Sequence, residues 1–502
     1  MTKEIKTKVL VVGSGPGGYV AAIRAGQLGL DTTIVENERL GGTCLIRGCI
    51  PSKALIHVAG KFEAMQHATS GSLGIRLREP PTLDLPKTIA WKETIVDKLN
   101  SGVGALLKRA KVKVVPGWGS FTDAKTCVVN GSGDPVMIIA EHVILANGSE
   151  PVELPTLPFG DTILSSTEAL SLQEIPEQFV IVGAGYIGLE LGIAFRKMGS
   201  NVTVVEALDR ILPLYDEQLT DPVRKWLDQA GVTVHLGAKA QRSTGDTNRG
   251  SLQVQLTDGQ ILQIPADKIL VTVGRRPKTK GWGLEKMAVD MKGPFVKVDD
   301  QCKTSVKNVW AIGDLVGEPM LAHKASAQAE MVAEIIAGKP RRFKPATIPA
   351  VCFTEPEIVT AGLLPIEAKA AGVDAITGLF PLSANGRALS MEGGSEGGFI
   401  RVVARRDNHR VLGVQAVGTH VSELSGEFVH AIEMGAVLED IAGTIHVHPT
   451  LTEAFHESAL RALGHAIHIW PAAHWALDDA ATDHEYRRTA SAGEEARAED
   501  VL

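Results

Sequence analysis

The chain has 502 residues, which is long enough for about three domains with separate cores. Apolar residues make up 44% and charged residues 22%, a globular balance that excludes a fibrous or disordered protein. The net charge of −7 provides no basic surface for nucleic acid or anionic membrane, and no stretch reaches transmembrane length. There is no signal or transit pattern, and five cysteines are too few for a secreted disulfide scaffold, so we expect a cytoplasmic protein without a metal site.

The first motif is a glycine-rich turn between a short β-branched run and a helical pattern. Residues 8–12 form the run, Gly13, Gly15 and Gly18 follow, a helix is predicted over residues 19–28, and the next strand ends at Glu36. Strand, glycines, helix and terminal acid in this order predict a βαβ unit that binds a dinucleotide.

The same pattern returns later in the chain. A strand is predicted over residues 179–182, followed by Gly183, Gly185 and Gly188, a helix to residue 198, and a strand over 201–205 that ends at Glu206. In both copies the acid follows the first glycine at the same spacing. One such motif is a weak signal, but two copies predict two dinucleotide sites.

The residue types in these motifs explain the chemistry. The first glycine allows the tight turn, the second lets the backbone approach a pyrophosphate, and the third lets helix and strand pack closely. The helix N-terminus favours the negative charge. Glu36 and Glu206 can accept hydrogen bonds from ribose hydroxyls, and a carboxylate would repel a 2′-phosphate. The second site should therefore prefer NAD to NADP.

Two cysteines, Cys44 and Cys49, follow the first motif. In a regular helix their Cα atoms would be roughly 8 Å apart, too far for a good disulfide. If the two are bonded, the turn between them must be distorted; Gly48 allows the distortion, and Pro51 can start a regular helix behind it. The alternative is a pair of buried, unbonded thiols. Cys127, Cys302 and Cys352 have no close partner and are expected to be ordinary apolar thiols.

A histidine and a carboxylate lie close together near the C-terminus. Pro449 can open a helix, which would place His448 at its start and Glu453 about one turn inside. A histidine oriented by a carboxylate is a plausible acid/base pair. The alternative is that such a histidine is simply a surface residue at a helix start. For His446 we predict this alternative.

In these motifs, residues 7–469 resemble the dihydrolipoyl dehydrogenases, which are the flavin disulfide reductases of the 2-oxo acid dehydrogenase complexes. Within this family the chain most closely resembles the form that serves branched-chain substrates. The resemblance is carried by the block at residues 41–53, both glycine motifs, residues 311–314 and 320–323, and His448, Pro449, Thr450 and Glu453. It implies a redox-active disulfide between Cys44 and Cys49, with FAD and NAD as cofactors. It also implies a homodimer in which His448 and Glu453 complete the site of the other subunit, and a lipoylated acyltransferase as partner.

The resemblance also implies individual cofactor contacts. For FAD these are Gly13, Gly15, Gly18, Glu36, Gly42, Thr43, Lys53, Gly119, Asn147, Gly148, Ser149, Asp314, Met320, Leu321, Ala322 and His323. For NAD they are Gly183, Gly185, Tyr186, Ile187, Gly188, Glu190, Glu206 and Gly274. Lys53 and Glu190 resemble a pair close to flavin and nicotinamide, and buried together they would need each other.

The expected fold is α/β, with two Rossmann-like dinucleotide-binding domains and an α+β C-terminal dimerisation domain. The expected boundaries are residues 1–150 for the FAD domain, 151–277 for the NAD domain, 278–347 for a central domain that completes the FAD site, and 348–469 for the dimerisation domain. Residues 150–158, rich in proline, read as a linker. Residues 470–502 form a polar extension that we expect to be disordered.

The chain departs from the family pattern at three positions. The family has Asn and Val where this chain has Ile46 and Arg47, and Thr where it has Asn147. One hypothesis is that the Arg47 guanidinium lies near the two sulfurs and favours the thiolate, and the alternative is an outward-pointing, solvated side chain.

Three alternative functions can be compared with these residues. A glutathione- or trypanothione-type reductase would use the same core, but Glu206 argues against its NADPH preference. A mercuric reductase would carry a further cysteine pair near the C-terminus, and no cysteine follows Cys352. A flavoprotein scaffold subunit with an idle site is the alternative from a different class.

Overall fold

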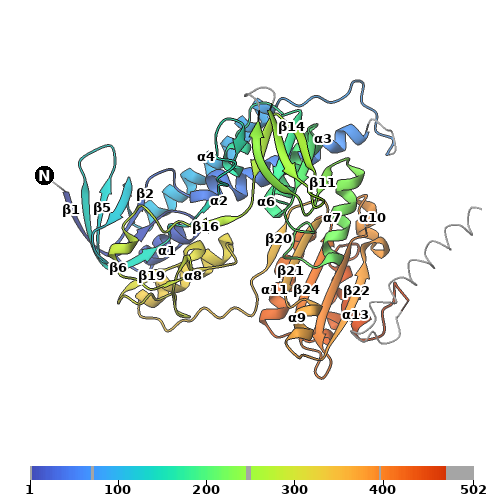
Figure 1. The fold of residues 1–502 in the computed structure, drawn as a ribbon. Coiled ribbons are helices and arrows are strands. Elements are labelled where there is room, and N and C mark those ends of the chain that lie inside the picture. Colours follow the sequence, from blue (N-terminus) through green and yellow to red (C-terminus); the bar gives the residue numbers. More distant parts are fainter. Residues whose placement is uncertain (1–2, 69–72, 245–249, 395–396, 471–502) are drawn as a thin grey trace, which may run out of the picture. The chain divides into compact units, whose positions relative to one another are not determined.

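The computed structural model describes residues 3–68, 73–244, 250–394 and 397–470, which form two compact units (Figure 1). The first unit contains the chain up to residue 213 and residues 227–344; the second contains residues 214–226 and the chain from residue 345. Helix α7 (Glu217–Gln229) runs across the boundary. The four-domain division therefore remains a prediction, and the expected polar extension lies outside the described residues beyond Trp470.

The first unit is built around a seven-stranded sheet in the order β3-β2-β1-β6-β5-β4, with β19 paired to β6. Its central strand β1 runs parallel to β2 and β6, with Val12 opposite Val35 and Leu145. Val9 to Val11 are fully buried, as expected for a parallel strand covered on both faces. The strands are β1 (Lys3–Val12), β2 (Thr32–Glu36), β3 (Lys113–Pro116), β4 (Trp118–Phe121), β5 (Thr126–Asn130), β6 (Val136–Leu145) and β19 (Val309–Ala311).

The second sheet of this unit repeats the pattern. Its order is β11-β10-β9-β15-β8, with every pairing parallel. Helices α1 (Pro16–Gln27) and α6 (Tyr186–Met198) occupy equivalent places after the first strand of each sheet. The internal repeat predicted from the glycines is thus present as two βαβ units. The strands are β8 (Ile163–Leu164), β9 (Gln178–Val182), β10 (Asn201–Val205), β11 (Thr233–His235) and β15 (Lys268–Val271).

The predicted linker at residues 150–158 is partly wrong. Its start belongs to strand β7 (Ser149–Pro151), which pairs antiparallel with β16 (Arg275–Pro277). Proline fits such a two-stranded edge because it needs no ladder hydrogen bond on its outer side. The smaller sheets of the unit comprise β12 (Lys239–Thr244), β13 (Gly250–Gln255) and β14 (Ile261–Ala266), and β17 (Met291–Lys292) with β18 (Phe295–Val296).

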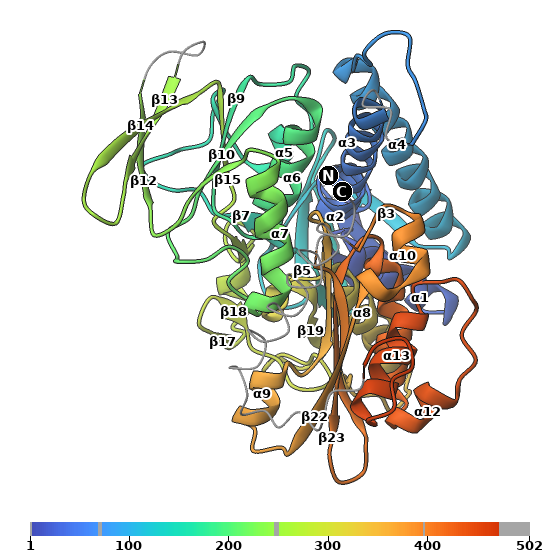
Figure 2. The same ribbon diagram turned by 90° about the vertical axis from the view of Figure 1, so that its right-hand side faces the viewer.

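Long helices cover the first sheet. Helices α3 (Cys49–Ala68) and α4 (Leu85–Arg109) run side by side in both views (Figures 1 and 2). Asp84 caps α4 by accepting a hydrogen bond from the Lys87 N–H at 3.1 Å. Within the described residues, no helix is both long and apolar enough to cross a bilayer. The other helices of the unit are α2 (Gly42–Arg47), α5 (Ser166–Ala169), α8 (Ala322–Ile336), and the short η1 (Leu284–Lys286) and η2 (Gly313–Val316).

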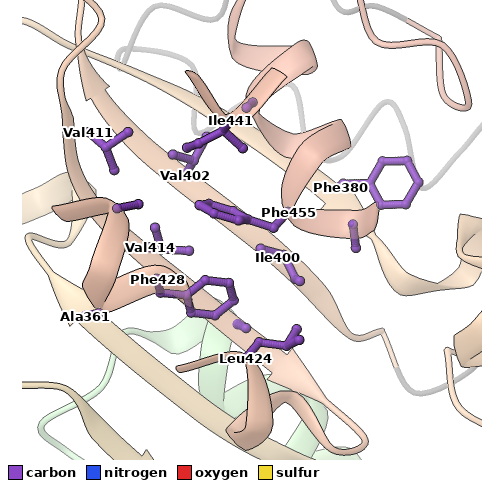
Figure 3. Packing of buried hydrophobic residues seen from close by; sticks show 14 of the residues in the cluster. Ala361, Phe380, Ile400, Val402, Val411, Val414, Leu424, Phe428, Ile441 and Phe455 are labelled. Atoms are coloured by element: carbon purple, nitrogen blue, oxygen red, sulfur yellow. The ribbon is translucent and has the colours of Figure 1, made fainter. Parts of the chain in front are cut away.

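The second unit is an antiparallel five-stranded sheet in the order β20-β21-β24-β23-β22. The Phe428 and Phe455 rings pack edge-to-face over it at 5.0 Å, among Val402 and Val414 (Figure 3). An α/β fold with two nucleotide-type units and an α+β C-terminal unit is therefore confirmed. Its elements are β20 (Ala350–Cys352), β21 (Glu357–Gly362), α9 (Pro365–Ala370), β22 (Ala375–Pro381), η3 (Leu382–Ala384), α10 (Gly386–Ser390), β23 (Phe399–Arg405), β24 (Val411–Gly418), η4 (Val421–Leu424), α11 (Ser425–Glu433), α12 (Leu438–Gly443) and α13 (Glu453–Ala462).

A buried arginine ties residues 214–226 to this sheet. The Arg401 side chain, 6% exposed, forms a salt bridge with Asp216 and donates to Gln218 Oε1 at 2.7 Å and to Gln415 Oε1 at 2.8 Å. All three of its nitrogens are thus hydrogen-bonded, as a buried guanidinium requires.

We expect Arg401→Ala to lower the free energy of unfolding by about 3 kcal/mol, because it leaves the Asp216 carboxylate without its buried partner. Urea unfolding followed by circular dichroism measures this loss. Arg405→Ala on the same strand, which removes an exposed pair with Asp407, is the control and should leave the midpoint unchanged. Equal midpoints for both variants would contradict the assignment.

Candidate functional site

The first glycine turn has room only for glycine. Gly13 has φ +94°, and a Cβ there would lie 2.4 Å from the Ala146 carbonyl oxygen. A Cβ on Gly18 would lie 1.8 Å from the Gly13 carbonyl oxygen. Gly15 is the N-cap of α1 and no side chain caps this helix end, so its first N–H groups point to a site suited to an anion.

The terminal acid of each unit binds its own glycine turn. Glu36 Oε2 accepts hydrogen bonds from the Ser14 N–H and hydroxyl, both at 2.8 Å, and Oε1 accepts the Glu38 N–H at 3.0 Å. In the second unit Glu206 accepts the Ala184 N–H at 2.6 Å and the Leu208 N–H at 2.8 Å. Each carboxylate is therefore held at the mouth of its turn, where a ribose is expected.

The helix that carries the cysteines is broken between them. Cys44 lies in α2, Cys49 is the first residue of α3, and Gly48 separates the two helices. A Cβ on Gly48 would lie 2.9 Å from the Thr43 carbonyl oxygen, which explains why the break needs glycine. The distortion expected at Gly48 is confirmed, whereas α3 begins at Cys49 and places Pro51 inside its first turn.

The two sulfurs form a hydrogen-bonded dithiol in this structure. The Cys44 S–H donates to Cys49, and this bond, with burial, raises the pKa of Cys44. The same bond lowers the pKa of Cys49 to about 7, with burial opposing the shift and the Lys53 charge supporting it. Of the two, Cys49 thus has the lower pKa and is the first to ionise.

Lys53 and Glu190 form the ion pair expected from the resemblance. Lys53 Nζ lies 2.7 Å from Glu190 Oε2, and the Glu190 side chain is 4% exposed. The pair joins α3, which begins with Cys49, to α6 of the second nucleotide unit. Because a carboxylate this deeply buried needs a compensating charge, the pair fixes the positive charge near the sulfurs.

Arg47 has a carboxylate partner in this structure, and its action on the two sulfurs remains a hypothesis. Its guanidinium forms an ion pair with Glu38, and Arg47 is not among the groups that shift the pKa of either cysteine. The carboxylate that pairs with Arg47, Glu38, lies only two residues beyond Glu36 in the sequence. The Arg47 side chain is 32% exposed, and the residue also lines the cavity described next, so the solvated alternative stays open as well.

A cavity in the first unit brings most of the predicted cofactor contacts together. Both cysteines open into it. The predicted FAD contacts that line it are Gly13, Gly15, Glu36, Gly42, Thr43, Lys53, Gly119, Asn147, Gly148, Ser149, Asp314, Met320 and Ala322; the predicted NAD contacts are Tyr186, Ile187 and Glu190. The lining does not include Gly18, Leu321, His323, Gly183, Gly185, Gly188, Glu206 or Gly274, whose roles remain predictions.

Arg275 is a cavity residue that the sequence analysis missed. It donates to the Ser149 hydroxyl at 2.8 Å and to the Ser149 carbonyl at 2.9 Å, and that hydroxyl donates to Asp314 at 2.5 Å. Its position directly after Gly274 at a strand end was the available signal. Ser14, Trp118, Lys278 and Trp282 were missed as well, and their positions in the sequence carry no comparable signal.

The other cysteines are buried away from this cavity. Cys127, Cys302 and Cys352 are at most 1% exposed. Burial raises the pKa of Cys127 and of Cys302 to about 12, so these thiols stay protonated. The expectation that these three cysteines lie in apolar, buried surroundings is confirmed.

His448 and Glu453 are paired in the second unit, although not in the helix that was expected. Nδ1 of His448 lies 2.9 Å from Glu453 Oε1, and Oε2 accepts the Thr450 N–H at 2.8 Å. Burial acts against ionisation, but these bonds lower the pKa of Glu453 overall. Pro449 does not open a helix: α13 begins at Glu453, because that carboxylate holds residues 448–450 as a loop.

His446 is not a surface histidine. Its side chain is 6% exposed, Nε2 lies 3.1 Å from Glu427, and its ring packs 5.1 Å from that of His456. In contrast, the His448 side chain is 80% exposed. Of these two histidines, therefore, His448 can reach a substrate.

We expect Cys44→Ala to raise the pKa of Cys49, because the S–H donor that lowers it is removed. Each unit of pKa gained lowers the thiolate fraction at pH 7 by about 10-fold when most of the thiol is protonated. The rate of iodoacetamide labelling of Cys49 in the reduced protein, followed by peptide mass spectrometry against pH, measures the shift. Cys127→Ala is the control, and identical pH profiles for both variants would contradict the hydrogen-bond assignment.

The sequence matches the family model of the pyridine nucleotide-disulphide oxidoreductases over residues 7–329 and that of their dimerisation domain over residues 348–459. It is 56% identical to a dihydrolipoyl dehydrogenase of Pseudomonas aeruginosa, over 93% of this chain and 100% of that protein. It is 45% identical to a dihydrolipoyl dehydrogenase of Geobacillus stearothermophilus, over 93% and 98%. The crystal structure of LpdA from Mycobacterium tuberculosis is similar with a TM-score of 0.83 at 27% identity, over 91% of this chain and 99% of that one.

These matches cover both structural units, and the resemblance inferred from the motifs is confirmed at the level of the family. Members of this family use FAD and NAD, which agrees with the two nucleotide units and the dithiol. The dimerisation domain supports a homodimer. The chain belongs to the pyridine nucleotide-disulphide oxidoreductases, in the group of the dihydrolipoyl dehydrogenases.

Proposed function

We propose that this enzyme oxidises protein-bound dihydrolipoyl groups of a 2-oxo acid dehydrogenase complex to lipoyl groups and reduces NAD to NADH. The observation that carries the proposal is the Cys44–Cys49 pair, which is held across a helix break and lines the nucleotide cavity. The partner we propose is the lipoylated acyltransferase of such a complex. Service of branched-chain substrates remains a prediction.

The cavity fits FAD. Gly42, at φ +59°, approaches the glycine turn so closely that a Cβ would lie 2.5 Å from the Gly15 Cα, which leaves the backbone N–H groups of both segments for a pyrophosphate. Glu36 would hold the adenosine ribose, and Asp314 with Ser149 would hold further hydroxyl groups. Bound FAD supplies a two-electron acceptor for the dithiol and a hydride donor for NAD.

His448 is the proposed base. With its Nδ1–H donated to Glu453, its Nε2 can accept the proton of a substrate thiol, of which only about 3% is ionised at pH 7 without help. The substrate thiolate attacks Cys44 of the oxidised pair, and Cys49 leaves as a thiolate. The second substrate thiol then displaces Cys44 to form the lipoyl disulfide, and its proton passes to the Cys44 sulfur, while the first proton stays on His448. The result is the reduced form of the cysteine pair.

Cys49 is the better leaving group because its pKa is the lower of the two. Lys53 supports that charge, and Glu190 holds Lys53 in place. We propose that His448 serves the cysteines of the partner subunit in a homodimer. Support comes from the family's dimerisation domain and from the exposed apolar side chains on both sides of His448: Ile445 is 96% and Val447 71% exposed.

One assay separates this function from the alternatives. The purified holoenzyme should oxidise NADH with lipoamide and should be inactive with glutathione disulfide and NADPH. Activity with glutathione disulfide alone would favour the glutathione-type reductase. A protein that binds FAD but reduces neither disulfide would be the scaffold.

We expect His448→Gln to slow oxidation of dihydrolipoamide by 10²- to 10⁴-fold, as is typical when a general base is lost. Electron transfer from NADH to a dye needs no such base and should change little. Stopped-flow and steady-state assays measure both rates. His409→Gln, which breaks another His–Glu pair of the same unit, is the control; equal slowing of both reactions by His448→Gln would remove His448 from this role.

We expect Glu206→Ala to weaken NAD binding and to narrow the preference for NAD over NADP, because the carboxylate that would bind the ribose hydroxyls is removed. Steady-state kcat/KM values with both nucleotides measure the preference. Glu36→Ala, the equivalent change in the first unit, should weaken FAD retention without narrowing the NAD preference. A wild type that prefers NADP would show that Glu206 does not select the nucleotide.

A further inference from the structure

His446 is a buried titratable group that the proposed reaction does not use. Its side chain is 6% exposed, whereas the flanking Ile445 and Val447 are 96% and 71% exposed. Within one subunit, the packing at the front of the loop over residues 445–450 therefore rests mainly on His446. This loop carries His448, the proposed base, two residues further on.

The rear of the same loop is held by separate hydrogen bonds. The Thr450 N–H donates to Glu453 at 2.8 Å, and the amide of Asn385, which is 3% exposed, donates to the Thr450 carbonyl at 3.1 Å. The Thr450 hydroxyl donates to the Val447 carbonyl at 2.6 Å, inside the loop. His448 thus lies between a rear anchor at Thr450 and a front anchor at His446.

Both ring nitrogens of His446 face hydrogen-bond acceptors. Nδ1 lies 2.9 Å from the Thr444 carbonyl oxygen, and Nε2 lies 3.1 Å from Glu427 Oε1. A neutral imidazole has one N–H, so either tautomer would leave a nitrogen lone pair facing an oxygen. Both contacts become hydrogen bonds when the ring carries two protons. The anchor therefore holds one proton more than a neutral imidazole and an ionised carboxylate would.

The groups around His446 leave this proton on the His446–Glu427 pair. The His456 ring of α13 packs at 5.1 Å from the His446 ring, and its Nδ1 lies 3.3 Å from the Ile441 carbonyl oxygen. One N–H satisfies that contact, so a neutral His456 is sufficient. Glu427 is the carboxylate that α11 directs at His446. Asp440 of α12 lies in the first turn of its helix, at the opposite end.

We infer that His446 is a positioning residue for the proposed base His448. As an imidazolium bound by Thr444 and Glu427, it anchors the front of the loop and so directs His448 at its substrate. The inference rests on the proposed function, since it needs His448 as the base. The anchor is complete while the His446–Glu427 pair is protonated, and it is lost as the pH rises through deprotonation of the pair.

The first test removes the anchor. His446→Ala should slow oxidation of dihydrolipoamide by the holoenzyme about 10- to 100-fold, the usual cost of a small misplacement of a reacting group. Electron transfer from NADH to a dye does not use His448 and should keep its wild-type rate. His409→Gln, which breaks the exposed pair with Glu439 in the same unit, is the control and should leave both rates unchanged.

The second test removes the need for the proton and keeps the anchor. In Glu427→Gln the amide can donate to a neutral Nε2, while Nδ1–H still donates to the Thr444 carbonyl. The wild type should lose dihydrolipoamide oxidation, relative to dye reduction, on the alkaline side of its pH profile. Glu427→Gln should keep its rate there. Deuterium exchange of the peptide 445–450, corrected for the intrinsic rate at each pH, should rise with pH in the wild type and stay constant in this variant.

A wild-type rate of dihydrolipoamide oxidation in His446→Ala would overturn the inference while the proposed function stands. Equal slowing of dye reduction in that variant would also overturn it, because the residue would then act on the whole fold. If His446→Ala does not fold, Glu427→Gln decides: an alkaline loss identical to that of the wild type would exclude the protonated anchor. A wild type that does not oxidise dihydrolipoamide at any pH would instead overturn the proposed function.

Discussion

The broken helix at Gly48 is the constraint on which the active site depends. The Thr43 carbonyl comes so close to Gly48 that no side chain fits, and this approach lets α2 end and α3 begin within one residue. A continuous helix would hold Cys44 and Cys49 too far apart to exchange a proton or form a bond. The break lets the Cys44 S–H donate a hydrogen bond to Cys49, which lowers the pKa of Cys49. Both cysteines line the nucleotide cavity.

The two nucleotide units share the same hydrogen bonds between the terminal acid and the glycine turn. Each terminal acid binds the N–H of the residue after the first glycine and an N–H two residues beyond itself. These bonds place a carboxylate at the mouth of each glycine turn before any nucleotide binds. What distinguishes the units is their surroundings: the first lies against the cysteine-bearing helix, whereas the second contributes Glu190, which orients Lys53 toward the sulfurs.

Charge organises both chemical groups of this enzyme. Lys53 favours the thiolate of Cys49, and its own charge is balanced by a nearly buried Glu190. Glu453 is kept ionised by the Thr450 N–H and by His448, so it can fix which nitrogen of the imidazole remains available. In the proposed reaction, the cysteine pair accepts the electrons and His448 accepts the proton. The charges of Lys53 and Glu453 beside them favour these roles. Arg47, in contrast, has its charge balanced by Glu38.

The sequence by itself determined both βαβ units and the place where the turn between the cysteines can distort, because each is written in a spacing of a few residue types whose backbone demands are strict. The family and the Lys53–Glu190 pair were expected from the resemblance that these motifs carry. Only the tertiary structure decided which sulfur has the lower pKa, that Arg47 pairs with Glu38, that His446 is buried while His448 is exposed, and that Arg275 binds Ser149, which in turn binds Asp314. These outcomes depend on burial and on partners far apart in the chain, which no local pattern encodes. The loop at Pro449 shows where prediction from local sequence fails. A proline permits a helix start, but the Glu453 carboxylate binds residues 448 and 450, and the helix begins only at Glu453.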